Sequence, residues 1–133
     1  MKWHQMRGRR LPMKPSMRQA MHEVSIMQSA LDSAMEELHK AGGDRITRMK
    51  LRVGVLSGVV PEALEFAFAA LKASTPAAAA ELKIEMAPAY FRCLDCKAMV
   101  ERIEMTFVCP TCNGALIVDH GGRQLELTQL ELN

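Results

Sequence analysis

The chain has 133 residues, enough for one modest core and a small metal-stabilised module, and it holds no stretch long and apolar enough to cross a membrane. The formal net charge is +2, but residues 1–20 hold six basic and no acidic residues, so the remaining 11 Lys and Arg face 15 Asp and Glu. This mildly acidic body argues against nucleic-acid binding, which needs a basic surface.

The chain begins with a basic leader, residues 1–20, which contains two prolines and no regular apolar spacing. Its composition is typical of disorder. The leader also lacks the apolar core of a secretory signal peptide, which favours a cytoplasmic location. Because Met21 opens the first segment with a folded pattern, we interpret Met21, in preference to Met1, as the biological start. A tail that contacts nucleic acid or a membrane is the alternative.

A helix and a strand are predicted directly after the leader. Apolar residues recur at spacings of three and four, which places them on one helical face: Val24, Met27, Leu31, Met35 and Leu38. The pair Gly42 and Gly43 ends this helix. Apolar and polar residues then alternate over residues 47–55, as they do in a strand with one buried face.

A second helix and a second strand follow. Pro61 and Glu62 suit the first turn of a helix, because proline is tolerated there and a carboxylate complements the helix dipole. The apolar face of this helix consists of Leu64, Ala67, Phe68 and Leu71. Alternation over residues 82–86 predicts the next strand, and alternation over residues 125–132 predicts a last one. The phase of that last strand slips at residues 128–129, which indicates a bulge.

All four cysteines lie in two Cys-x-x-Cys pairs, Cys93/Cys96 and Cys109/Cys112, with twelve residues between the pairs. Each pair suits a tight turn, and the chain between them can fold back to complete a tetrahedral site. The pattern predicts one structural Zn(II) ion. Iron bound by the same thiolates, a redox dithiol and a pair of disulfides are the alternatives. Because a closed four-thiolate site has no open coordination position, this site is not expected to catalyse a reaction.

The order of the predicted elements indicates an α+β fold. The expected body has two helices on a three-stranded sheet and is formed by residues 21–87 together with residues 122–133. A zinc-ribbon-like module with the four cysteines is inserted at residues 88–121, and residues 1–20 precede the body as a disordered leader. No arrangement of a nucleophile with a base, or of paired carboxylates, emerges from the spacing, so the chain is not expected to be an enzyme.

The segment Met21-His22-Glu23, followed by the two Cys-x-x-Cys pairs in this order, resembles the HypA/HybF family of hydrogenase-maturation nickel metallochaperones. Residues 54–64 and 122–127 match the family pattern as well, and the resemblance covers residues 21–133. It implies a carrier that binds Ni(II) as cargo at Met21, His22 and Glu23 and holds structural zinc at the four cysteines. It also implies a HypB-type nickel GTPase and the hydrogenase large-subunit precursor as partners, with urease maturation proteins as further candidates.

The proposed nickel motif is chemically reasonable but depends on the leader. Ni(II) accepts square-planar nitrogen coordination, to which the His22 imidazole can contribute. Met21 offers a free α-amine only if the chain starts there; with residues 1–20 attached, the same nitrogen is an amide. A zinc-ribbon adaptor, or a nucleic-acid-binding protein that uses the basic leader, is the alternative function. Without the family pattern, a lone histidine before a helix is an ordinary surface residue.

Overall fold

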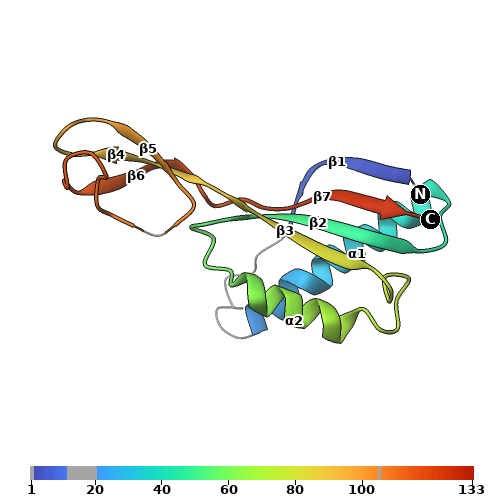
Figure 1. Cartoon of the computed structure of the whole chain (residues 1–133). Helices are drawn as coiled ribbons and strands as arrows, with labels where there is room; N and C mark the ends of the chain where they lie inside the picture. The colour runs from blue at the N-terminus through green and yellow to red at the C-terminus, as the bar shows by residue number, and fades with distance from the viewer. Residues whose placement is uncertain (1, 12–20, 105) are drawn as a thin grey trace.

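The structure is a computed structural model that describes residues 2–11, 21–104 and 106–133. Two helices cover one face of a four-stranded sheet, and a smaller three-stranded sheet extends from one end of it (Figure 1). This arrangement confirms the predicted α+β class. No helix within the described ranges is long and apolar enough to span a membrane.

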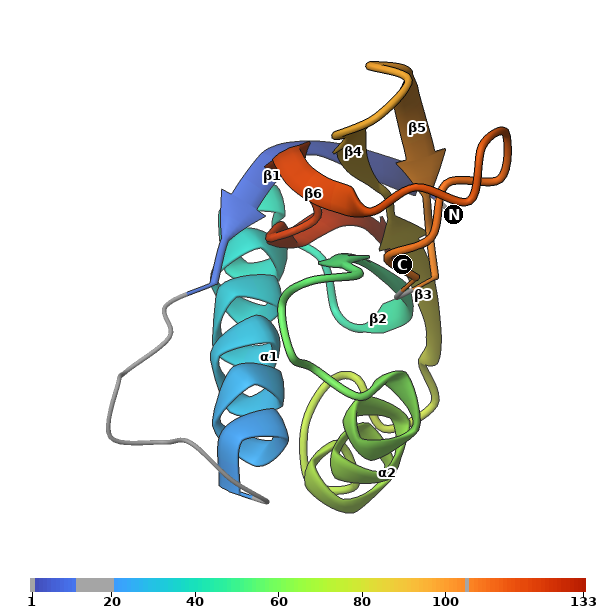
Figure 2. The same ribbon diagram turned by 90° about the vertical axis from the view of Figure 1, so that its left-hand side faces the viewer.

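Helices α1 (Met21–Ala41) and α2 (Pro61–Leu71) pack against each other beneath the sheet (Figure 2). Helix α1 ends at the predicted glycine pair. Gly42 has φ +67°, a conformation that favours glycine, and the N–H of Gly43 donates a hydrogen bond of 3.1 Å to the carbonyl of Leu38. The glycine pair therefore both turns the chain and caps the helix.

The buried face of α1 differs from the predicted one in its first turns. Val24, which was expected to be buried, is 37% exposed, whereas Ile26 is 1% exposed. Ala30 and Ala34 are fully buried as well and let the helix approach the sheet closely. The buried stripe is therefore wider than the spacing of the large apolar residues indicated, and Val24 lies outside it.

The large sheet has the strand order β1-β7-β2-β3. Strand β2 (Ile46–Gly54) pairs in parallel with β3 (Glu81–Ala87), and helix α2 makes the crossover between them. On its other side β2 pairs antiparallel with β7 (Leu125–Leu132). These are the strands predicted from alternation, so the last segment of the chain does complete the sheet of the body.

A bulge interrupts β7 at the predicted position. The register passes from Lys50 opposite Gln129 to Leu51 opposite Leu127, so Thr128 is an extra residue. The hydroxyl group of Thr128 donates a hydrogen bond of 3.2 Å to the carbonyl of Lys50. The phase slip in the sequence therefore keeps leucines on the core side both before and after the bulge.

Strand β1 (Lys2–Arg10) is the main difference from the sequence-based prediction. It pairs antiparallel with β7 and becomes the edge of the large sheet. The expectation of a disordered leader is therefore wrong for this segment, while residues 12–20 lie outside the described residues. The physical reason is that an unpaired strand edge can bind any extended backbone, so pairing of this kind needs no apolar alternation in the added strand.

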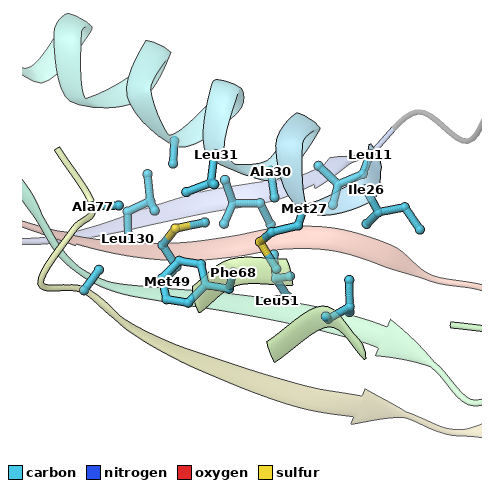
Figure 3. Close-up of a cluster of buried hydrophobic side chains, with 14 of the residues drawn as sticks. Leu11, Ile26, Met27, Ala30, Leu31, Met49, Leu51, Phe68, Ala77 and Leu130 are labelled. Carbon is cyan, nitrogen blue, oxygen red and sulfur yellow. The ribbon is translucent and has the colours of Figure 1, made fainter. Parts of the chain in front are cut away.

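The main core lies between the helices and the sheet (Figure 3). Met27 and Leu31 of α1 meet Met49 and Leu51 of β2, and all four side chains are fully buried. Phe68 of α2 closes the same cluster, so one core is shared by both helices and the inner strands. The predicted apolar faces of α2 and β2 are confirmed.

The smaller sheet forms the cysteine module, with the antiparallel order β5-β4-β6. Its strands are β4 (Ala89–Cys93), β5 (Met99–Arg102) and β6 (Leu116–Gly121). Its own core contains five buried residues: Ala89, Phe91, Cys93, Cys109 and Leu116. The domain boundaries at residues 88 and 121 stay a prediction, which the separation into two sheets and two cores supports.

Two glycines let the chain segments cross closely where the module leaves the body. A Cβ atom on Gly54 would lie 2.2 Å from the carbonyl oxygen of Gly122, and a Cβ atom on Gly122 would lie 2.7 Å from the Cβ atom of Ala89. The N–H of Gly54 and the N–H of Leu56 each donate a hydrogen bond of 2.6 Å across this crossing. Glycine is thus needed here for close backbone approach.

Candidate metal centre

Two turns with the same backbone conformation present the four cysteines. In the first turn the N–H of Lys97 donates a hydrogen bond of 3.1 Å to the carbonyl of Cys93, and in the second the N–H of Asn113 donates one of 2.9 Å to Cys109. The residue after the second cysteine adopts a left-handed conformation in both turns, with φ 64° at Lys97 and 61° at Asn113. Each turn therefore presents two of the four cysteines in the same backbone geometry.

The four sulfur atoms converge within 4.8 Å of one another. The Sγ atoms of Cys93 and Cys112 lie 3.4 Å apart, and those of Cys96 and Cys109 lie 3.8 Å apart. A metal ion with four tetrahedral metal–sulfur bonds of about 2.3 Å places its sulfurs about 3.8 Å apart, so the donor set fits such an ion. Cys93 and Cys109 are buried, while Cys96 and Cys112 are exposed.

Backbone N–H groups stabilise two of the thiolates. Hydrogen bonds from the N–H of Cys112 and then of Thr111 lower the pKa of Cys109 from 9.0 to about 6. The N–H of Cys96 is the largest cause that lowers the pKa of Cys93. These donors favour the negative charge that a metal ligand must carry.

The fourth sulfur shows the opposite effect. The N–H of Gly114 lowers the pKa of Cys112, but the adjoining sulfurs, first that of Cys93, together with partial loss of hydration at the sulfur raise it to about 12. Four clustered sulfurs cannot all become thiolates without a nearby cation. A bound divalent ion removes this repulsion and completes the site.

The Met-His-Glu segment forms the first turn of α1. Met21 is the first residue of the helix, His22 is half-buried, and Glu23 is 7% exposed. Successive side chains on a helix point about 100° apart, so His22 and Glu23 face different directions. The structure thus places the three predicted nickel residues together on the backbone but does not direct both side chains to one point.

Glu23 has a specific partner that the sequence did not reveal. Its Oε1 atom accepts a hydrogen bond of 3.3 Å from the N–H of Val60, the residue that precedes α2. The two residues are 37 positions apart, so no local pattern could have predicted the contact. The first turn of α1 is thereby attached to the beginning of α2.

Together these features define a small metal-binding protein: an α+β body with a closed four-cysteine centre at one end. The protein-family model described as "Hydrogenase/urease nickel incorporation, metallochaperone, hypA" matches residues 21–132. The chain therefore belongs to the HypA family of hydrogenase and urease nickel metallochaperones. This confirms the resemblance seen in the sequence, and it places the chain among maturation factors and not among enzymes.

Relatives from several bacteria match most of the chain. A hydrogenase maturation factor HypA from Chloroflexus aurantiacus is 43% identical over 112 residues, which cover 84% of this chain and 98% of the relative. The HypA protein from Geotalea uraniireducens is 40% identical and is covered to 99% of its length. The 112 aligned residues, as many as the family model matches, are therefore nearly the whole of these relatives.

Solved structures share the fold. The solution structure of the Ni metallochaperone HypA from Helicobacter pylori matches with a TM-score of 0.57 at 22% identity and covers 83% of this chain and 96% of that one. A second solution structure of a HypA protein matches with a TM-score of 0.58 at 24% identity, covering 85% of this chain and 97% of that one. At these identities the likeness establishes the fold.

Proposed function

We propose that this chain binds Ni(II) at the first turn of α1 and helps to insert it into the large-subunit precursor of a [NiFe]-hydrogenase. The observation that carries this proposal is the attachment of Glu23 to the N–H of Val60. It holds the first turn in a defined place while His22 remains half-exposed and accessible to an ion. A carrier needs this combination of an ordered binding segment and an open face from which cargo can leave.

The beginning of a helix also supplies backbone donors. The first four N–H groups of a helix have no partner within the helix, so the nitrogens of Met21, His22 and Glu23 are not engaged in helical hydrogen bonds. If these amide nitrogens release their protons to solvent when the ion binds, they and the His22 imidazole would form a set of nitrogen ligands of the kind that square-planar Ni(II) prefers. In this role Glu23 contributes its backbone and positions the turn through its carboxylate.

We further propose that the ion in the four-cysteine centre is structural Zn(II). Four thiolates in a tetrahedral arrangement favour zinc, which has no redox chemistry of its own. The buried position of Cys93 and Cys109 inside the small core supports a structural role, because the ion then holds that core together. Cysteines that bind a metal ion and form no disulfide support a reducing, cytoplasmic location.

The partners follow from the same proposal. The chain has no phosphate-binding G-x-x-x-x-G-K-[ST] loop, so a nucleotide-dependent step requires another protein, for which we propose a HypB-type nickel GTPase. Urease maturation proteins are further candidates, because the family description includes urease. The zinc-ribbon adaptor or nucleic-acid-binding alternative is not favoured, since the family match extends over the body as well as the cysteines.

Calorimetric titration of Ni(II) into zinc-loaded protein tests the proposal. The chain starting at Met1 and the chain starting at Met21 are compared, each with and without His22→Ala. We expect one nickel per chain. His22→Ala should weaken the affinity at least tenfold, because the imidazole ligand is lost; a tenfold loss corresponds to about 1.4 kcal/mol of binding free energy. The difference in nickel affinity between the chain that starts at Met1 and the chain that starts at Met21 measures how much a free α-amine at Met21 contributes to binding.

His39→Ala is the matched control, because His39 is an exposed histidine at the opposite end of the same helix. Its affinity for nickel should equal that of the unsubstituted chain. Equal losses for His22→Ala and His39→Ala, or no nickel binding at all, would rule out the Met-His-Glu site.

A further inference from the structure

The edge of β7 that faces away from β2 is occupied by a strand from the chain's own leader. Strand β1 runs along it from Lys2, opposite Leu132, to Arg10, opposite Glu126. Without β1, the outer edge of β7 would present unpaired backbone groups, which readily bind an additional strand. Both termini lie at the end of the large sheet that is farther from the cysteine module (Figure 1).

The residue that follows β1 anchors the strand in the core. Leu11 is 2% exposed, and its N–H donates a hydrogen bond of 3.0 Å to the carbonyl of Leu125. It belongs to the main core together with Ile26 of α1 (Figure 3). A strand that pairs with the β7 edge is therefore followed by a leucine that is buried in the main core.

The two paired strands have opposite net charges in the sequence and share an irregularity of the backbone register. Residues 2–11 carry four basic and no acidic residues, whereas β7 carries Glu126 and Glu131. The pairing of β1 is irregular between Gln5 and Arg9, beside the place where β7 bulges at Thr128 against β2. This shared irregularity defines one register for the pairing.

Strand β1 lies outside the region that the family model matches. The family model matches residues 21–132, and the Chloroflexus aurantiacus relative is covered to 98% of its length by the corresponding alignment. The β7 edge thus belongs to the part of the chain that these relatives share, while β1 precedes that part. The matched region is also nearly as long as the whole of this relative, which makes a chain that starts at Met21 a reasonable test protein.

From these observations we infer that the β7 edge and the buried position of Leu11 form a docking site for an extended basic peptide that ends in a leucine. Residues 2–11 of the same chain occupy this site in the structure. An incoming strand of the same chemistry binds only when that segment is displaced. The leader is therefore an intramolecular competitor for its own docking site, with the advantage of a high effective concentration.

A labelled peptide of residues 2–11 serves as the probe, and its fluorescence anisotropy is followed against three zinc-loaded proteins. These are the full chain, the chain that starts at Met21, and the full chain with Leu11→Asp, which disfavours burial of the anchor. We expect one peptide to bind per Met21-start chain and binding to the full chain to be at least about 100-fold weaker, because the attached strand competes. The Leu11→Asp chain should recover binding.

Matched controls distinguish specific docking from nonspecific binding of the peptide. The peptide with Leu11→Asp should bind at least about tenfold more weakly to the Met21-start chain, because it lacks the leucine that is buried in the main core. The full chain with Ile117→Asp, an isoleucine that is 45% exposed on β6 of the cysteine module, should exclude the peptide as the unsubstituted chain does. Equal binding to the full and Met21-start chains, or none to a folded Met21-start chain, would overturn the inference.

A second measurement needs no truncated protein. Hydrogen exchange of the full chain should show protected β7 amides that lose protection in Leu11→Asp and keep it in Leu11→Met, which preserves an apolar anchor. Unchanged protection in Leu11→Asp would overturn the anchoring role. Dimers of the Met21-start chain that form in place of peptide binding would assign the edge to a second copy and overturn the peptide proposal.

Discussion

The carboxylate of Glu23 accepts a hydrogen bond of 3.3 Å from the backbone N–H of Val60 and so joins the start of α1 to the start of α2. Glu23 is 7% exposed, and α2 has no side-chain cap of its own. A negative charge near the beginning of a helix is favourable because the unpaired N–H groups there carry partial positive charge. One side chain thus stabilises both helix starts and orders the proposed nickel segment.

Replacement of Glu23 should therefore lower the stability of the body. We expect Glu23→Ala to reduce the free energy of unfolding by about 1.5–3 kcal/mol, because a hydrogen bond to a charged group is lost and the Val60 N–H loses its partner. Glu23→Gln retains an acceptor and should cost about 1 kcal/mol. Urea unfolding of the zinc-loaded protein measures both values. Glu65→Ala, on the exposed side of α2, is the control, and a loss as large as that of Glu23→Ala would contradict the assigned role.

An ion pair on the outer face of the sheet gives a pH-dependent prediction. The hydrogen bond from Lys50, with Nζ 2.8 Å from the carboxylate, is the largest cause that lowers the pKa of Glu85 from 4.5. The folded state thus favours the carboxylate, so the stabilisation is complete above pH 4.5 and is lost as the pH falls through the lowered value. Because both side chains are partly exposed, the pair contributes less than about 1 kcal/mol at neutral pH.

Lys50→Met should therefore raise the pKa of Glu85 towards its ordinary value, which an NMR titration of the Glu85 carboxyl carbon measures. Lys83→Met is a suitable control, because Lys83 lowers the same pKa only through a weaker charge interaction. A shift after Lys83→Met as large as that after Lys50→Met would show that general charge, and not the hydrogen bond, determines the pKa of Glu85.

The crossing between body and module should tolerate no side chain at Gly54. We expect Gly54→Ala to cost about 3 kcal/mol or more, because the new Cβ would lie 2.2 Å from the backbone oxygen of Gly122 and two crossing hydrogen bonds would have to shift. In Gly42→Ala the new Cβ would have no atom within 4 Å, so the substitution should cost only about 1 kcal/mol, for the φ of +67° that alanine disfavours. Denaturant unfolding compares the two, and equal costs would contradict the close approach.

Removal of the metal should unfold the cysteine module alone. Two of the five buried residues in its core, Cys93 and Cys109, are metal-binding cysteines, whereas the body has a separate core. Hydrogen-exchange mass spectrometry after complete chelation should show lost protection in residues 88–121 and retained protection in β2 and β7. Zinc should restore the module. Protection of the module that survives chelation would mean that its own side chains suffice for folding.

The local elements were predictable because their signals lie within short windows. Alternation predicted β2, β3 and β7 together with the bulge beside Thr128, and the spacing of apolar residues predicted α2. The two Cys-x-x-Cys pairs predicted a closed site, since each pair forms a turn by itself. Val24 was placed wrongly, because which stripe of a helix is buried depends on the surface against which it packs.

Two contacts depend on residues that are far apart in the sequence. The pairing of β1 with β7 uses backbone groups that every residue possesses, so the basic leader carried no sign of it. The bond between Glu23 and Val60 joins positions 37 residues apart. Neither contact has a periodic pattern, and each forms only after the sheet and helices have brought its partners together.

By itself the sequence determined the α+β class, the cysteine cluster and membership of a nickel-carrier family, because each rests on spacings that are read within a segment or recur throughout the family. Only the tertiary structure decided that Lys2–Arg10 completes the sheet, that Leu11 enters the core and that Glu23 fixes the first turn of α1. The reason is that each of these contacts joins segments that are distant in the sequence and come together only in the folded chain.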